Sequence, residues 1–179
     1  MLAYLFVILA VAFRFLPHSF HDWNFTPVAA ALLYFGARAP RKHIWMPVAL
    51  LGLSDFYLTV FHYKLAWSWS YFVVILAWYT AIALLGSLLA KRENIGAITA
   101  ASLTASITFF VVTNAISPWI IPGMYSHDVH GVIAALSAGV PFFRSTVVSD
   151  LLFTAVAFGT PHWISAFERR SARSRTATA

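Results

Sequence analysis

The sequence predicts an all-α integral membrane protein built as a six-transmembrane-helix bundle. Of its 179 residues, 60% are hydrophobic and only 10% are charged, and the mean hydropathy is +0.76. A soluble domain carries about a quarter charged residues, so this composition excludes one. The length suits about six helices of roughly 20 residues each, since a helix of about 20 residues crosses a bilayer. It leaves no room for a separate soluble domain.

Polar residues, prolines and glycines divide the chain into six apolar stretches. These are residues 1–17, 26–37, 44–62, 71–90, 95–117 and 141–167. We expect one membrane domain over residues 1–167 and a basic cytoplasmic tail over residues 168–179. A further apolar piece, residues 131–139, is too short to span, which favours a short interfacial or re-entrant helix that leads into Pro141.

The first stretch is predicted to stay in the protein as a helix. Its Ala10-Val11-Ala12 resembles a signal-peptide cleavage site, but a basic n-region is missing and Arg14 follows directly. Asn-Phe-Thr-Pro at residues 24–27 leads into the second stretch, a pattern that caps a helix at Asn24 or Thr26 with Pro27 in the first turn. This helix end carries a partial positive charge. Capping alone explains the pattern. Binding of an anionic or carbonyl-bearing ligand at this helix end is compatible with it but is not required.

Two acids lie inside apolar stretches, in the repeated pattern Ser-Asp-x-x-x-Thr at Asp55 and Asp150. A carboxylate at bilayer depth costs about 2.5–3.5 kcal/mol, so both side chains are expected to face the bundle interior. Asn114 and Arg144 lie at similar depth, and we expect Arg144 to pair with one acid. The pair either fixes helix register or belongs to the wall of a substrate cavity. Both can hold.

In the fifth stretch, Ala97, Ala101 and Ala105 recur at every fourth residue beside Ser102 and Ser106. Such a stripe lets another helix approach closely. It serves packing within the bundle or docking of a partner protein.

The basic residues mark the ends of the apolar stretches. Clusters follow the second stretch, the fourth stretch and the sixth stretch, so the net charge of +6 does not indicate a nucleic-acid partner. The positive-inside rule then places both termini in the cytoplasm. The loops at residues 18–25, 63–70 and 118–140 face outward, and most of the histidines and many tryptophans lie there.

We therefore predict an outward-facing pocket for a small molecule, with aromatic and histidine-bearing loops as its lid. Its candidate substrate-binding residues are Asn24, Asp55, His62, Trp67, Asn114, Trp119, Tyr125, His127, His130, Arg144 and Asp150. Flat ligands would stack on the aromatic rings. The expected partners are this small molecule and membrane lipids.

A metal-dependent membrane enzyme is the alternative class. "HSFHD" at 18–22 and "HDVH" at 127–130 offer imidazole and carboxylate ligands, but neither spacing is specific. The absence of cysteine excludes thiolate sites. We predict no metal, no cofactor and no enzymatic activity. A structural membrane protein, whose polar pairs only fix packing, is the third possibility.

Four segments resemble a family of small uncharacterised bacterial integral membrane proteins. They are "NFTPVAAALLYFGA" from Asn24, "LSDFYL" from Leu53, "TNAISPW" from Thr113 and "VPFFRSTVVSDLLFT" from Val140, and the similarity runs over roughly residues 24–158. The resemblance implies a multi-pass protein of the bacterial cytoplasmic membrane.

The size, the six-helix layout and the outward pocket are similar to the substrate-binding S component of an energy-coupling-factor (ECF) transporter, including the cobalamin-binding type. This resemblance implies capture of a vitamin or cofactor at the outer face, with transport driven by separate coupling and ATPase subunits. The chain has no P-loop motif, so any ATP chemistry would come from those partners.

Overall fold

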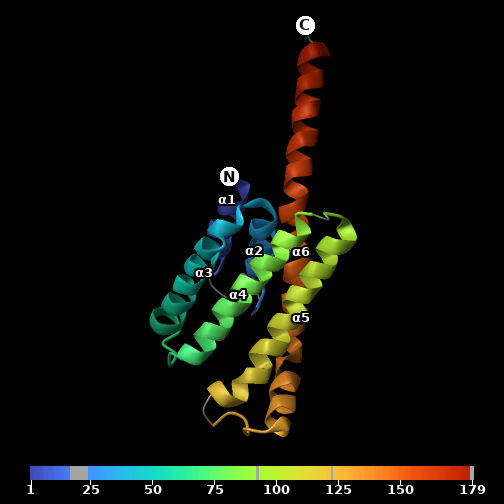
Figure 1. Ribbon diagram of the computed structural model, residues 1–179. Helices are drawn as coiled ribbons and strands as arrows, with labels where there is room; N and C mark the ends of the chain where they lie inside the picture. The colour runs from blue at the N-terminus through green and yellow to red at the C-terminus, as the bar shows by residue number, and fades with distance from the viewer. Residues whose placement is uncertain (17–23, 92, 122, 178–179) are drawn as a thin grey trace.

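The structure, a computed structural model, describes residues 1–16, 24–91, 93–121 and 123–177, with side chains as far as Pro161. It is 82% helix, and no strand occurs in these ranges. In chain order the elements are α1 (Leu2–Phe13), α2 (Val28–Arg38), the 3-10 turn η2 (Arg41–His43), α3 (Trp45–Tyr57), the π-helical turn η3 (Leu58–His62), α4 (Trp69–Leu89), α5 (Ile95–Ile120) and α6 (Val129–Ala177) (Figure 1).

Four stretches of helix in the described part of the chain are long and apolar enough to cross a membrane. They are Arg41–His62, Trp69–Leu89, Ile95–Ile120 and Val129–Pro161. This confirms the all-helical prediction and is typical of a multi-pass membrane protein. The apolar helices α1 and α2 have 12 and 11 residues. At 1.5 Å per residue they are about 18 and 16 Å long, against a hydrocarbon core of about 30 Å. The count of six spans stays a prediction.

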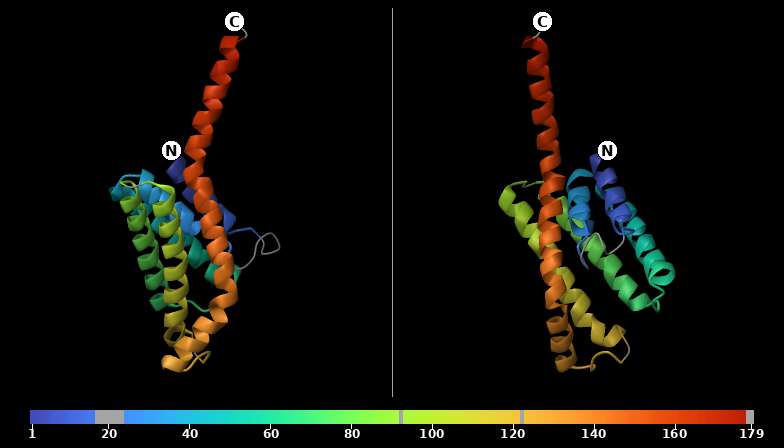
Figure 2. Two further views of the ribbon diagram at one scale, coloured as in Figure 1. Left: turned by 90° about the vertical axis from the view of Figure 1, so that its right-hand side faces the viewer. Right: turned by 180° about the vertical axis from the view of Figure 1, so that it is seen from behind.

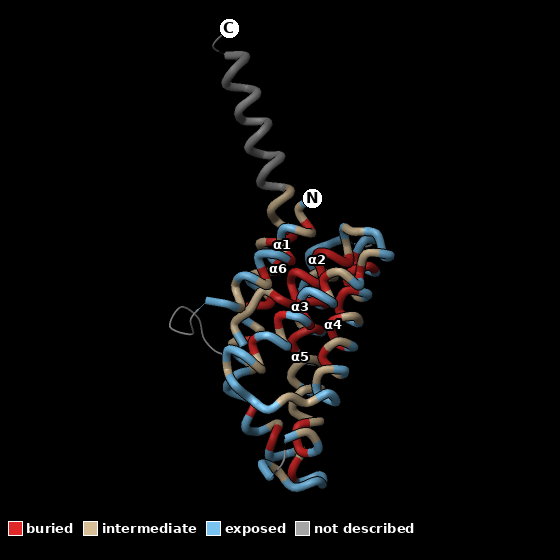
Figure 3. Tube along the Cα trace, turned by 90° about the vertical axis from the view of Figure 1, so that its left-hand side faces the viewer, coloured by how far each residue is buried: buried red, intermediate tan, exposed pale blue. Residues whose placement is uncertain are grey.

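Helix α2 lies at the centre of the bundle because it is apolar on every side. All nine residues from Val28 to Gly36 are buried, as expected for a helix without a polar face. It packs against α1, α4, α5 and α6. The backbones of α2 and α4 touch where glycines meet: a Cβ on Gly36 would strike the Ala83 carbonyl, and one on Gly86 would strike the Leu33 carbonyl. Figure 3 shows the buried residues gathered around α2 and α4.

The small-residue stripe of α5 packs inside the bundle against α6. Ala101, Ser102, Ala105 and Ser106 are all buried, so this face of α5 is occupied within the chain. Thr154 of α6 donates a hydrogen bond to Ser102 Oγ at 3.3 Å. The packing interpretation of the stripe therefore accounts for its composition.

Helix α6 corrects the expectation of a separate short helix at 131–139. The helix begins at Val129 and continues through Pro141 and Pro161 to Ala177. Proline is tolerated inside membrane helices because neighbouring helices and hydroxyl side chains satisfy the freed backbone groups. Residues 168–177, the predicted basic tail, continue this helix beyond the bundle (Figure 2).

The two ends of the bundle differ in charge. The N-terminus and the α2–α3 and α4–α5 connections lie at one end (Figure 1), which we call the basic end after Arg38, Arg41, Lys42 and Lys91. There Arg38 pairs with Glu93 at 2.7 Å, and Tyr4 hydrogen-bonds His43 at 2.6 Å. The α3–α4 and α5–α6 connections lie at the opposite end.

Candidate functional site

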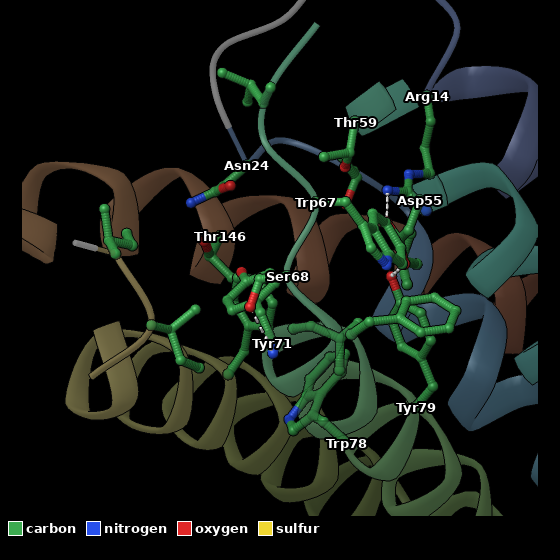
Figure 4. Close-up of a pocket in the computed structure, with 18 of the residues that line it drawn as sticks. Arg14, Asn24, Asp55, Thr59, Trp67, Ser68, Tyr71, Trp78, Tyr79 and Thr146 are labelled. Carbon is green, nitrogen blue, oxygen red and sulfur yellow. Dashed lines mark hydrogen bonds and ion pairs between the residues drawn. The ribbon is translucent and has the colours of Figure 1, made fainter. Parts of the chain in front are cut away.

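A cavity of about 850 Å³ opens between the helices towards the end opposite the basic end. Its wall comes from Arg14 after α1, residues 24–29 at the start of α2, the α3–η3 junction, loop residues 65–68, α4, the end of α5 and the middle of α6. Figure 4 shows Arg14, Asp55 and Tyr79 on one side of this space and Asn24 and Thr146 on the other. Its volume lies within the range of small-molecule sites, about 300–1,000 Å³.

Arg14 and Asp55 form an ion pair in the cavity wall. One guanidinium nitrogen of Arg14 contacts Asp55 Oδ1, and the other donates to Ser54 Oγ at 2.8 Å. Tyr79 of α4 donates its hydroxyl to Asp55 Oδ2 at 2.8 Å (Figure 4). The pair retains side-chain exposures of 15% and 18%, so it is accessible from the cavity. These bonds offset the energetic cost of a carboxylate at this depth, and they connect α3 to α4 and to the end of α1.

The turn that follows Asp55 departs from α-helical geometry. Leu58–His62 form a π-helical turn directly after α3, and Thr59 within it lines the cavity. Such turns occur frequently at functional sites. The loop then reverses at Lys64, whose φ is 53°, and brings residues 65–68 back over the cavity.

Asp150 of α6 is the second acid of the cavity wall. It is 3% exposed, and its Oδ2 accepts a hydrogen bond from Ser106 Oγ at 2.7 Å. No ion pair joins it to any described residue. Its environment thus differs from that of Asp55, although both acids occur in the same sequence pattern.

Aromatic side chains make up much of the remaining wall: Trp67, Tyr71, Phe72, Trp78, Tyr79 and Phe109. Trp78 is held in place because its indole N–H donates to Thr108 Oγ1 at 3.0 Å. Trp67 packs against Phe72 at a centroid distance of 4.8 Å. The indole nitrogen of Trp67 is buried and has no hydrogen-bond partner in the described part of the chain. A buried N–H normally has a partner, so this nitrogen is an unsatisfied donor that solvent does not reach.

A smaller cavity of about 240 Å³ adjoins the first. The two walls share six residues: Asn24, Tyr71, Phe109, Ile121, Met124 and Thr146. Asn114 and Tyr125 line only the smaller one. Asn114 also marks a close approach of α5 and α6, since a Cβ on Gly139 would lie 2.5 Å from its Oδ1.

The start of α2 faces the larger cavity without a side-chain cap. The helix begins at Val28 with Pro27 before it, and neither Asn24 nor Thr26 caps its backbone. Asn24 instead adopts a left-handed backbone conformation with φ of 62°. The expected capping is therefore wrong, because the chain turns at Asn24 and directs the uncapped first turn to the cavity.

A model of a protein family described as a family of unknown function, DUF6580, matches residues 1–173. The chain belongs to this family. No curated protein and no solved structure matches it.

The structure of this DUF6580 chain brings together about half of the predicted site residues. Asn24, Asp55, Trp67 and Asp150 line the larger cavity, and Asn24, Asn114 and Tyr125 line the smaller one. The remaining five line neither cavity and are exposed: His62, Trp119, His127, His130 and Arg144.

The expected pairing of Arg144 with an acid is wrong. Asp55 pairs with Arg14, and Asp150 is bonded by Ser106. Arg144 is exposed on α6 and has no ion pair among the described residues. Residues 144 and 150 are six apart, and at 100° per residue this places them far from each other around the helix. Similar depth along a helix was therefore insufficient to predict a contact.

The histidine motifs of this family member form no metal centre in the part that the structure describes. No group of three or more His, Asp or Glu side chains suited to a metal is found there. In "HDVH", Asp128 directly precedes α6 and accepts a hydrogen bond from the Gly131 amide at 2.9 Å. That bond, with a second from Ser126, lowers the pKa of Asp128. The "HSFHD" motif at 18–22 lies outside the described residues.

Arg14, Tyr71, Trp78 and Tyr79 are cavity residues that the sequence did not predict. Arg14 carried a usable signal. It is the one charged side chain of the first apolar stretch, residues 1–17, and a cation at that depth requires an acid. The rings of α4 gave no such signal, since an apolar helix contains many aromatic residues without a binding role.

Proposed function

We propose that this DUF6580 protein is the solute-binding component of a small-molecule uptake system in the bacterial cytoplasmic membrane. The observation that carries the proposal is the cavity: a space of about 850 Å³ with an Arg14–Asp55 pair, a second acid and aromatic walls. Protein sites for small molecules combine a mostly apolar wall with a few polar groups in fixed positions.

The distribution of charge supports an outward-facing cavity. Basic residues gather at the end opposite the cavity, and the positive-inside rule assigns such an end to the cytoplasm. A solute would then enter from outside, past the loop that contains Trp67. Trp67 and its loop neighbours Leu65, Ala66 and Ser68 line the cavity along this path.

Energy for uptake would come from separate coupling and ATPase subunits, as in the S components that the sequence resembles. The stripe on α5 is not their docking surface, because α6 covers it. The outer face of α1, where Leu5, Ile8 and Leu9 are exposed, is open to lipid or to such a subunit. Co-purification of coupling subunits with the tagged chain tests this part of the proposal.

Native mass spectrometry of the protein purified in a mild detergent tests the proposed function. We expect a bound small molecule to appear as a mass increment. Ala66→Trp, which fills the cavity from the exposed loop, should abolish it. Ala100→Trp, on an exposed face of α5 away from the cavity, is the matched control and should retain it. Equal retention of the molecule by both variants would contradict binding in the cavity.

A further inference from the structure

The charges in the larger cavity do not balance. Three charged side chains line it among the described residues: Arg14, Asp55 and Asp150. Arg14 and Asp55 neutralise each other in an ion pair. The cavity is therefore left with one acid and no cation for it.

Asp150 cannot obtain that cation from the described part of the protein. It is buried, and among the described residues Ser106 alone donates a hydrogen bond to it. Arg144, six residues away on α6, is exposed and absent from the cavity wall. An unpaired carboxylate at membrane depth is costly. The group must therefore be neutralised by a proton or by the positive charge of a ligand.

The rings around the cavity suit the second possibility. A cation placed over a Trp or Tyr face within about 6 Å is attracted by the ring quadrupole, most strongly where water is excluded. Trp78 presents a ring fixed by its bond to Thr108, and Trp67 and Tyr71 line the same space. The wall thus offers a counter-ion together with aromatic faces.

An anionic ligand would find a poorer site. The guanidinium of Arg14 is already bound to Asp55, Ser54 and the Leu51 carbonyl. The uncapped start of α2 adds about half a positive charge, which is less than the full charge of Asp150. The local balance therefore stays negative when the acid is ionised.

We propose that the cavity takes an organic monocation, a protonated amine or quaternary ammonium group on an apolar or aromatic body, with Asp150 as its counter-ion. This inference rests on the proposed solute-binding function and names its substrate class. It would make Trp78 a specificity residue and leave the Arg14–Asp55 pair as a fixed part of the wall.

Three probes with one aromatic body and different charges test the proposal. Naphthylethylamine is cationic at neutral pH, naphthylethanol is neutral and naphthylacetate is anionic. Calorimetry on the purified full chain should show the amine binding at least about tenfold more tightly than the other two, the gain expected from one charged hydrogen bond. Asp150→Asn should remove this preference while naphthylethanol binding is unchanged. Trp78→Leu should weaken amine binding by about fivefold.

Two controls separate the proposal from loss of folding and from binding to detergent. Asp128→Asn makes the same change at an exposed acid outside the cavity and should keep the preference. Ala66→Trp should abolish binding of every probe. Tight binding of naphthylethanol or naphthylacetate in the cavity without amine preference would overturn the inference and leave the proposed function standing. Failure of all probes, with no co-purified molecule, would overturn both.

Discussion

Breaking the Arg14–Asp55 pair should strongly destabilise the protein. Removing one partner of a buried ion pair costs about 3–5 kcal/mol, because the other charge is left uncompensated. The insertion cost of a lone Arg or Asp at membrane depth, about 2.5–3.5 kcal/mol, gives a similar figure. The side chains keep 15% and 18% exposure, and water in the cavity relieves part of the penalty. We therefore expect about 3 kcal/mol for Arg14→Met and for Asp55→Asn.

The double variant distinguishes a pair from two independent effects. Arg14→Met with Asp55→Asn leaves no charge unpaired, so it should cost less than the sum of the single variants by at least about 2 kcal/mol. Reversible unfolding of the purified protein by SDS titration in mixed micelles measures these differences. The matched control is Arg144→Met, which should change stability by no more than about 0.5 kcal/mol because its side chain is exposed.

The Arg144→Met variant also tests whether the Arg14–Asp55 pairing is correct. The sequence favours Arg144 as the partner of an acid, whereas the structure gives that role to Arg14. If Arg144→Met costs as much as Arg14→Met and couples to Asp55→Asn, the pairing in the structure is wrong. Additive costs for Arg14 and Asp55 would equally refute it.

Three further substitutions test the packing and the polar contacts. Gly86→Ala should destabilise the protein by about 1–3 kcal/mol, since its Cβ would strike the α2 backbone. The control Gly96→Ala, in the exposed first turn of α5, should cause no such loss of stability. SDS unfolding measures the stability of both variants, and equal effects would contradict the close contact between α2 and α4. Ser106→Ala removes the hydrogen bond to the buried acid of α6 and should cost about 1–3 kcal/mol in the same assay; no change would show that this bond is dispensable. Asp128→Ala should speed hydrogen exchange of the Gly131 amide at neutral pH. Because folding lowers the pKa of Asp128 from 3.8, its stabilisation is complete above that value, and the difference between wild type and variant should vanish as the pH falls through the lower folded value. A difference that persists in acid would contradict the assignment.

The helical class and the interior acids could be predicted from sequence because both follow from the cost of polar groups in lipid. Apolar stretches of sufficient length have few alternatives to helices. The same cost indicated that Asp55 and Asp150 would avoid lipid, and both line the cavity. These predictions required no knowledge of which helices are neighbours.

The pairing of residues could not be predicted for the opposite reason. A depth estimate places a residue along the membrane normal and says nothing of rotation about the helix axis or of neighbouring helices. Arg144 has a suitable depth and lies on the wrong side of α6. Arg14, directly after α1, contacts Asp55 although the two residues are 41 positions apart in sequence. The helix boundary at 131–139 failed for a local reason, since α6 continues through Pro141.

The cavity itself follows from the shortness of two helices. α1 ends at Phe13 and α2 begins at Val28, so neither continues beside α3–α6 over the full length of the bundle. Backbone outside helices is tolerated at membrane depth only where it is buried in protein or lines a water-filled cavity. Arg14, Asn24 and Thr26, which lie between these helix ends, all line the cavity. Extending α1 or α2 to a full span would fill the space that the other helices enclose, so the short helices and the binding cavity are one structural feature.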